Sequence, residues 1–274
     1  MTGKLLYSVI TPHSPRMAVE ETAPAFLKGV LAGSKELGAA LRAAKPDLLI
    51  VHSTHWVCSF LWYVTCHERH RGFCVADEAP DMIPGLPYDR PGDPVFAEAL
   101  VKQLQGAGVP CGRNASPHYH WDYGSYVPLH YLDPEQKIPT VLVGTCLMSD
   151  LEECLKVGGL VRRTVEETGR RAVFVSSTAL AHKIVRGPDT WPPAEHQEND
   201  RRFIEMIRKG EVKAVKRWLP DYTKAVVAEM GGRNVATMLG TIDENCPRLL
   251  GASYGAYGQS SASGNISLSI QEAA

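Results

Sequence analysis

The feature that most constrains the fold of this chain is residues 46–57, PDLLIVHSTHWV. Residues 48–51 are apolar without alternation, which indicates a strand buried on both faces, as in the centre of a parallel sheet. A polar segment with His52 and His55 follows at once. Because open α/β sheets bind ligands where strands end at their carboxyl edge, this position predicts a functional role for His55.

A second strand, at residues 5–10, leads into the segment TPHSP. Pro12 and Pro15 hold His13 in a stiff, non-helical turn. Residues 20–44 have the apolar spacing of a helix with one buried face, and they complete a β-α-β unit that is expected to be right-handed. Two strands therefore each bring one imidazole to a strand end.

The rest of the chain continues the alternation of strands and helices. Further strands are expected at residues 61–65, 139–144, 172–176 and, as an edge strand, 266–270. Helices are expected at residues 93–105, 150–168, 200–209, 212–219, 223–230 and 235–242, and irregular segments at 74–94 and 187–198. We therefore predict one α/β domain over residues 1–274, with a central, mostly parallel sheet flanked by helices.

Composition excludes several classes of function. The net charge of −1 implies no basic face for nucleic acid and no polybasic strip for a membrane. No apolar run approaches the roughly 20 residues of a membrane span, and the N-terminus lacks the pattern of a secretory signal. The seven cysteines are in no CxxC arrangement and match no zinc spacing, so we expect reduced, mostly buried thiols in a cytoplasmic protein.

Two histidines and one carboxylate on one face of a metal form the ligand set of non-haem Fe(II) oxygenases. His13, His55 and Glu229 are candidates for this set, although spacing alone does not single out Glu229. A lone histidine in a loop is more often a hydrogen-bonded structural group. For His52, facing the other side of the strand end, a structural role is the better interpretation.

Three segments taken together resemble the class III (LigB-type) extradiol ring-cleaving dioxygenases: TPHSP, PDLLIVHSTHW and DYGSYVPL. Each is weak alone, but their order and spacing are fairly specific, and the resemblance covers most of the chain. It implies that His13 and His55 bind Fe(II) and that Glu229, in AEMGG, completes the triad. It also implies that His182, in TALAH, is the acid/base that acts on bound dioxygen and substrate.

Many members of this family have Asp-His-Gly where this chain has Asp122-Tyr123-Gly124. The difference is similar to the 2-aminophenol 1,6-dioxygenases, in which a tyrosine serves the substrate pocket. The resemblance therefore implies that Tyr123 binds and acts on an ortho-aminophenol, whose ring O2 opens to 2-aminomuconic 6-semialdehyde during aromatic degradation. His118 and His120 are candidates for hydrogen bonds to substrate, and solvated loop positions are an equally good interpretation.

The 2-aminophenol dioxygenases resemble complexes of a catalytic beta chain and a shorter, homologous alpha chain. This chain is similar to the alpha type in its length and in its short segment between His13 and His55. Our leading hypothesis is an alpha subunit that supports a catalytic beta subunit, as an α2β2 assembly. Two alternatives stay open: the chain is itself the catalytic Fe(II) dioxygenase on an aminophenol or catechol, or it is a non-catalytic scaffold. Mn(II) suits the same ligands.

Overall fold

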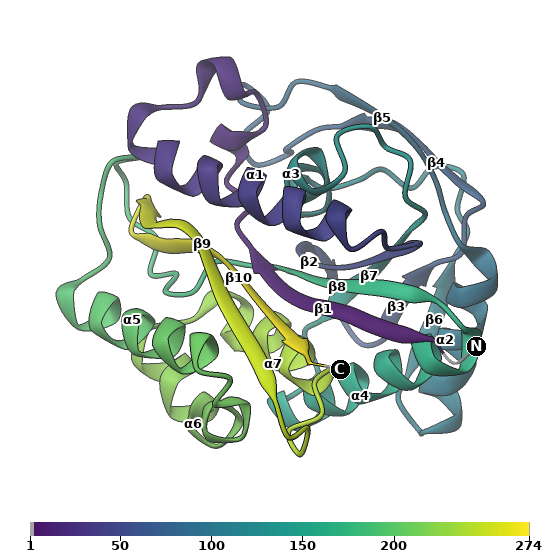
Figure 1. Ribbon diagram of the computed structural model, residues 1–274. Coiled ribbons are helices and arrows are strands. Elements are labelled where there is room, and N and C mark those ends of the chain that lie inside the picture. The colour runs from purple at the N-terminus through teal and green to yellow at the C-terminus, as the bar shows by residue number, and fades with distance from the viewer. Residues whose placement is uncertain (1–2, 274) are drawn as a thin grey trace.

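The computed structural model describes residues 3–273 and is built around an eight-stranded sheet with the strand order β6-β3-β7-β2-β8-β1-β10-β9 (Figure 1). The strands of this sheet are β1 (Lys4–Thr11), β2 (Leu48–Cys58), β3 (Trp62–Thr65), β6 (Cys111–Asn114), β7 (Thr140–Cys146), β8 (Arg171–Ser177), β9 (Leu249–Ser260) and β10 (Ser263–Glu272). Strands β7, β2, β8 and β1, at the centre of the sheet, run parallel to one another, which confirms the mostly parallel sheet.

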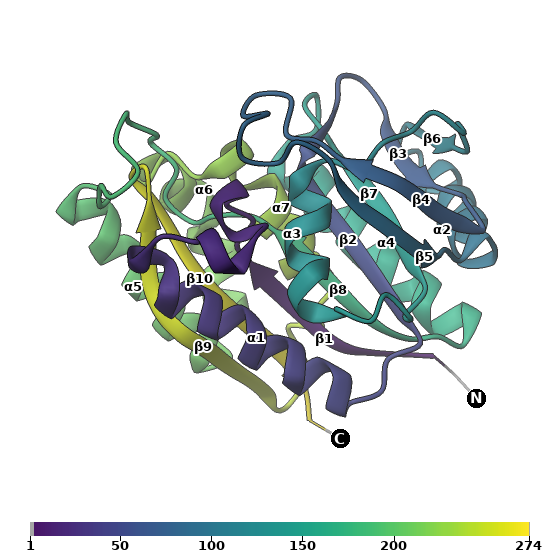
Figure 2. The same cartoon turned by 90° about the horizontal axis from the view of Figure 1, so that it is seen from above.

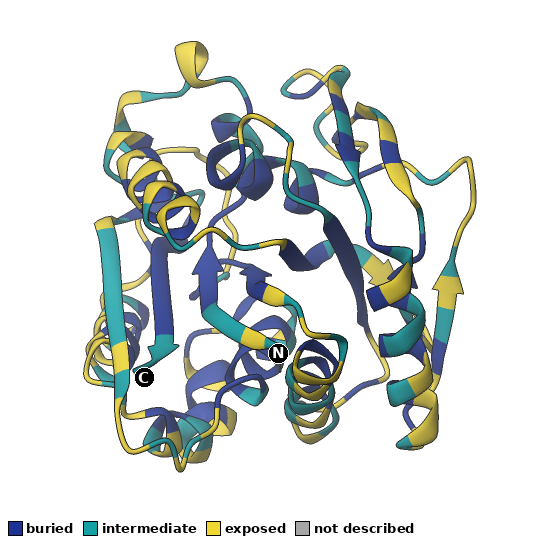
Figure 3. Cartoon of the chain, turned by 45° about the vertical axis from the view of Figure 1, so that its right-hand side comes forward, coloured by how far each residue is buried: buried dark blue, intermediate teal, exposed yellow. Residues whose placement is uncertain are grey.

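Helices cover both faces of the sheet (Figures 1 and 3). One face carries α1 (Lys28–Ala43) and α3 (Tyr123–Leu132). The other face carries α2 (Pro94–Gly106), α4 (Leu151–Thr168), α5 (Ala194–Arg208), α6 (Val212–Ala225) and α7 (Arg233–Gly240). The expected helix starts at residues 93 and 150 are the N-caps Asp93 and Asp150, whose carboxylates accept backbone hydrogen bonds from Phe96 and Glu153.

Strand β2 is buried on both faces, as its unbroken apolar run predicts. Leu48 and Ile50 pack into the core beneath α2 and α4, whereas Leu49 and Val51 pack into the core beneath α1 and α3. Because successive side chains of a strand point to opposite faces, this one segment contributes to both cores. Strand β2 therefore lies at the centre of the sheet, and His55 lies near its carboxyl end.

Residues 74–94 were expected to lack regular structure, and this expectation is wrong. Strand β5 (Leu86–Pro91) pairs antiparallel with β4 (Arg69–Cys74) in a separate two-stranded sheet, on the same side of the main sheet as α3 (Figure 2). The prolines at the ends of β5 are tolerated because a two-stranded sheet leaves one edge of each strand unpaired. Only residues 75–85 form a loop between the two strands.

The C-terminal segment was also predicted incorrectly, because residues 266–270 were expected to form an edge strand. Strand β10 instead lies between β1 and β9, antiparallel to both, and β9 is the edge. The Gly-rich sequence of β9 lets α1 approach closely, since a Cβ on Gly255 would lie 2.3 Å from the carbonyl oxygen of Gly29. Small residues selected for this close packing show no hydrophobic alternation, so the sequence pattern hid the strand.

Several helix boundaries differ from the expected ones. Residues 20–27 form two 3-10 turns around Pro24, and α1 begins only at Lys28. Helix α5 begins at Ala194, inside a segment expected to be irregular. The seven cysteines are free thiols within residues 3–273, and all but Cys246 are buried, as expected. In the same described range, we find no helix with the length and apolarity that a membrane crossing requires.

Candidate metal centre

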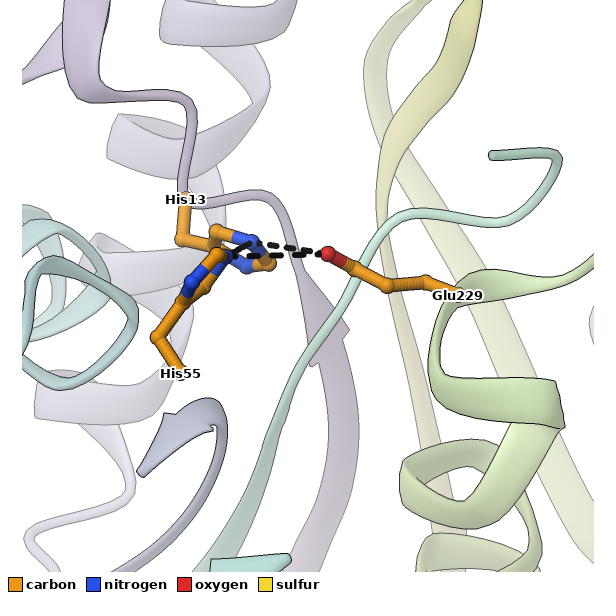
Figure 4. Close-up of side chains that lie close together, drawn as sticks. All are labelled: His13, His55 and Glu229. Atoms are coloured by element: carbon orange, nitrogen blue, oxygen red, sulfur yellow. Dashed lines mark hydrogen bonds and ion pairs between the residues drawn. The ribbon is translucent and has the colours of Figure 1, made fainter. Parts of the chain in front are cut away.

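The candidate centre lies at the carboxyl edge of the neighbouring strands β2, β8 and β1. His13 follows β1, and His55 lies in β2, at a point where the pairing of β2 with β7 shifts register between Ser53 and Val57. This irregularity re-aims the side chains of β2 beyond Ser53. As a result, His13 and His55 point toward each other and toward Glu229 (Figure 4).

The three side chains converge closely. The Nε2 atoms of His13 and His55 are 3.2 Å apart. Glu229 Oε1 lies 3.2 Å from His13 Nε2 and 3.8 Å from His55 Nε2. One ligand atom from each residue falls within 4.8 Å of the others, as in a site that holds a metal ion. His13 and Glu229 are buried, whereas 24% of the His55 side chain is exposed.

The hydrogen bonds around His13 fix which ring nitrogen faces the centre. Ser177 Oγ donates to the backbone carbonyl of Gly124 at 2.5 Å, so its proton is committed there. Its lone pairs then accept a hydrogen bond from His13 Nδ1, 3.1 Å away. In the neutral form of the ring, which is the form that binds a metal, the proton is therefore on Nδ1 and the lone pair of Nε2 faces the centre.

His55 has the same orientation through a different partner. Its Nδ1 lies 3.1 Å from Glu78 Oε1, and a carboxylate can only accept, so Nδ1 donates. Burial lowers the pKa of His55, and the neighbouring His13 lowers it further. His55 therefore also presents an Nε2 lone pair, and a carboxylate behind a ligand histidine is the usual support of a metal-binding imidazole.

Glu229 reaches the centre from a 3-10 turn, Glu229–Gly232, rather than from the helix expected at residues 223–230. Helix α6 ends at Ala225, and the chain then passes through Val227, with φ of 50°. Met230 and Gly231 also have positive φ, 48° and 64°. A left-handed β-branched residue is rare and is held only by surrounding structure. The helical prediction was wrong because this bent turn, and not a helix, aims the carboxylate.

The two oxygens of the Glu229 carboxylate have separate roles. Oε2 accepts hydrogen bonds from the backbone N–H of Ala179 at 2.5 Å and from Thr178 Oγ1 at 3.2 Å. This leaves Oε1 directed at the histidines. Burial alone would raise the pKa of Glu229, but His13 and His182 hold it well below its ordinary value. The group is therefore an anion, as a metal ligand must be.

His182 contacts the carboxylate of Glu229 as well. It follows β8, and its Nε2 is 3.2 Å from Glu229 Oε1, with 25% of the side chain exposed. Its backbone forms a bridge with Ser263 of β10, and the preceding Ala181 donates its N–H to the buried Asp200 at 3.2 Å. The imidazole is therefore held beside the centre with one side open to solvent, a position suited to moving protons.

Tyr123 is the first residue of α3, whose N-cap is Asp122. Its ring centroid lies 4.0 Å from that of His55 and 5.8 Å from that of His13. Burial raises the pKa of Tyr123, and the charge of Glu78 and a hydrogen bond with it raise it further. The hydroxyl therefore stays protonated at neutral pH and is a hydrogen-bond donor.

A cavity of about 500 Å³ opens beside His55 and Tyr123. Its wall is made by His55, Trp56, Gly72, Phe73, Val75, Asp77, Glu78, Tyr119, His120, Trp121, Asp122 and Tyr123. Of the two histidines before Tyr123, His120 lies in this wall, whereas His118 is exposed and lies outside it. The volume suits a single aromatic ring with its substituents.

Three supporting residues were not found from sequence. Glu78 lies in a loop with no motif, so nothing marked it. Ser177 directly follows a buried strand end, and Asp122 has the spacing of an N-cap for Ser125, signals that a closer search of strand and helix ends would have used. His52, in contrast, is buried away from the centre with Nε2 3.1 Å from Thr145 Oγ1, and burial lowers its pKa to about 3.

Comparison with known proteins identifies relatives over nearly the whole chain. A family model described as the catalytic LigB subunit of aromatic ring-opening dioxygenase matches residues 7–264. 3,4-Dihydroxyphenylacetate 2,3-dioxygenase of Escherichia coli is 22% identical over 250 residues, which cover 88% of this chain and 91% of the relative.

Two subunits of one enzyme from Pseudomonas sp are also similar. The 2-aminophenol 1,6-dioxygenase beta subunit is 27% identical, with 83% of this chain and 82% of the relative covered. The alpha subunit is 25% identical, with 83% and 86% covered. An uncharacterized protein from Escherichia coli K12, known from its crystal structure, has the same fold at a TM-score of 0.68, with 18% identity over 96% of this chain and 99% of that one.

Proposed function

Because this chain belongs to the family of the catalytic LigB subunit of aromatic ring-opening dioxygenase, we propose that it opens an ortho-substituted aromatic ring with O2 at its own metal centre. One observation carries the proposal. Both histidines have Nδ1 committed to a partner and present Nε2 to the point faced by Glu229 Oε1.

His13, His55 and Glu229 would hold the metal, and their donor set of two imidazoles and one carboxylate suits Fe(II), with Mn(II) as an alternative. When bound, such an ion supplies open coordination positions for the two ortho heteroatoms of the substrate and for O2. The protein supplies the orientation of the donors. In particular, the hydrogen bond from Ala179 N–H to Glu229 Oε2 leaves Oε1 as the donor atom.

His182 and Tyr123 are the proposed proton-handling residues. An ortho hydroxyl must lose its proton to become a good ligand, and the His182 imidazole, which contacts Glu229 and is partly exposed, would pass this proton to solvent. Tyr123 keeps its own proton and would donate a hydrogen bond to a substrate held against His55. The aromatic side chains in the cavity wall would hold the ring in plane and exclude water.

The reaction balances without an external reductant. One ring C–C bond, next to the two ortho substituents and not between them, is broken. Both atoms of O2 enter the product, and the electrons come from the ring. With 2-aminophenol the product is 2-aminomuconic 6-semialdehyde.

We propose 2-aminophenol as the substrate and a homologous beta chain as the partner, in an α2β2 assembly. Tyr123 in the Asp-Tyr-Gly segment and the similarity to both 2-aminophenol 1,6-dioxygenase subunits support this reading. The cavity beside His55 favours a catalytic site in this chain over a purely supporting role.

The test is anaerobic loading of the purified chain with Fe(II), followed by measurement of bound iron and of O2 consumed per 2-aminophenol or catechol. We expect one iron per chain and one O2 per ring. His55→Ala should lose both iron and activity, while His118→Ala, which changes an exposed histidine outside the cavity wall, should lose neither. Ring opening that persists in His55→Ala would overturn the proposal, as would failure to bind iron both alone and with a co-purified homologous chain.

A further inference from the structure

The fixed charges in the cavity wall are all negative. Asp77, Glu78 and Asp122 line the cavity, and the lining residues within the described part of the chain include no Lys or Arg. The guanidinium of Arg90 lies behind Trp121, 5.6 Å from its ring centroid, and is paired with Asp133 at 3.4 Å. The charge of Arg90 is therefore balanced by Asp133 and does not offset the negative charge of the cavity wall.

The three carboxylates differ in how far they are committed to other groups. Asp122 accepts hydrogen bonds from the hydroxyl groups of Ser53 and Ser125 and from the backbone N–H of Ser125. Glu78 contacts His55 through Oε1 but has 56% of its side chain exposed, and Asp77 beside it is exposed as well. Asp77 and Glu78 therefore form an acidic rim, whose negative charge acts on a substituent that extends from a bound ring.

The wall also contains polar atoms that lack a protein partner. Trp121 is only 2% exposed, yet its Nε1 has no acceptor among the described residues, and the buried hydroxyl of Tyr119 has no partner there either. Both groups are uncharged, so they do not offset the negative charge of the rim.

We propose that the acidic rim sets substrate specificity: the cavity accepts dihydroxylated or aminohydroxylated rings whose further substituent is neutral or cationic, an amine above all, and rejects rings that carry a carboxylate. Asp77 and Glu78 are the specificity-determining residues. The inference rests on the proposed ring-opening function for its biological meaning. It separates this chain from the relative named for 3,4-dihydroxyphenylacetate, an anion, to which it is 22% identical.

The expected size of the effect follows from elementary electrostatics. Charges a few ångströms apart still interact in water, and salt screens part of this interaction. A change of the substituent from carboxylate to ammonium reverses its interaction with both rim residues. We therefore expect the dissociation constants of matched amine and acid to differ by at least about tenfold.

The test uses three catechols that differ only at the end of a short side chain: 3,4-dihydroxyphenethylamine, 4-ethylcatechol and 3-(3,4-dihydroxyphenyl)propionate. Anaerobic binding to the iron-loaded protein is measured by quenching of tryptophan fluorescence, since Trp56 and Trp121 lie in the cavity wall. O2 consumption is measured in parallel. We expect the amine to bind most tightly and the acid most weakly, with a difference that shrinks as salt is added.

The combined variant Asp77→Asn with Glu78→Gln should reduce the ratio of amine to acid affinity by at least about threefold. Asp81→Asn, which changes an exposed acidic residue of the same loop outside the cavity wall, should leave the ratio unchanged. Equal affinity for amine and acid, or a ratio that the double variant does not alter, would overturn the inference even if all three rings are opened. Selective binding without ring opening would instead overturn the proposed function and retain the rim as a selective site.

Discussion

Two carboxylates contact His55, and they belong to regions of opposite character. Glu229 is 3% exposed and is held by Thr178, Ala179 and His13. These four residues form the floor of the site. Glu78 belongs to the acidic rim, is 56% exposed and extends from the loop at residues 75–85.

The floor and the rim control different properties of the site. In the floor, hydrogen bonds from backbone and side chain fix one carboxylate oxygen and leave the other facing the histidines. A buried charge held in this way loses little entropy on binding and interacts strongly with a cation. The rim is exposed to water and screened, so it can select substrates but contributes little to holding a metal.

The most direct way to break this comparison is to neutralise each carboxylate separately. We expect Glu229→Gln to lose iron and to lower ring opening about a thousandfold or more, because one charge pair about 4 Å apart is worth about 4 kcal/mol at the dielectric near a protein surface. Glu78→Gln still accepts from His55 Nδ1, so it should keep its iron and remain within about tenfold of the original rate. Iron content by mass spectrometry and O2 uptake decide the matter. Equal losses in the two variants would remove the distinction between floor and rim.

His182 tests whether the edge of the floor moves protons. Replacement by Asn should lower turnover about a hundredfold while iron stays bound, because proton transfer by a placed side chain contributes about that much. Lys183→Gln, at the exposed neighbouring position, is the control. Loss of iron in His182→Asn would show that this histidine is a ligand and not an acid/base.

The positions of the two histidines were predictable from the sequence, for a physical reason. A strand that is apolar on both faces must lie inside a parallel sheet, and residues that follow it must lie at the sheet's carboxyl edge. This argument placed His55, and the turn held by Pro12 and Pro15 placed His13. The identification of Glu229 came from the family resemblance, since its position depends on the left-handed turn at Met230 and Gly231, which leaves no periodic pattern.

The rim was not predictable from residue patterns. Glu78 has no neighbours in sequence that mark it, and it meets His55 only because β4 and β5 pair and bring the loop between them over the strand end. The Gly-rich strand β9 was missed for a related reason, since close packing on α1 requires small residues and removes the alternation that marks a strand. Long-range packing, and not local propensity, decides both features.

Acid stability gives a smaller and independent contrast between buried and exposed groups. Burial lowers the pKa of His52 to about 3 and that of His70 to about 4. Between about pH 6.5, the ordinary value, and those values, the unfolded chain binds more protons than the folded one, so stability falls as pH falls. Asp200, whose pKa burial raises to about 6, acts in the opposite direction over part of this range.

We expect these three groups together to lower the free energy of unfolding by about 2 kcal/mol between pH 7 and pH 5, measured by urea titration of the metal-free protein. His70→Gln can still donate to the carbonyl of Thr140 and should remove more than about 1 kcal/mol of this loss. The exposed His118→Asn should leave the pH dependence unchanged. A pH-independent stability would show that water reaches the buried histidines.

The smallest expected effect distinguishes two neighbours of the rim, His118 and His120. His120 lies in the cavity wall and His118 does not, although both precede Tyr123 and both are exposed. His120→Ala should raise KM for 2-aminophenol about threefold with kcat unchanged, because an exposed hydrogen bond to substrate is worth about 0.5–1.5 kcal/mol and acts equally on the ground and transition states. His118→Ala should change neither constant. A fall in kcat in His120→Ala would show that this histidine takes part in the reaction itself and not only in substrate binding.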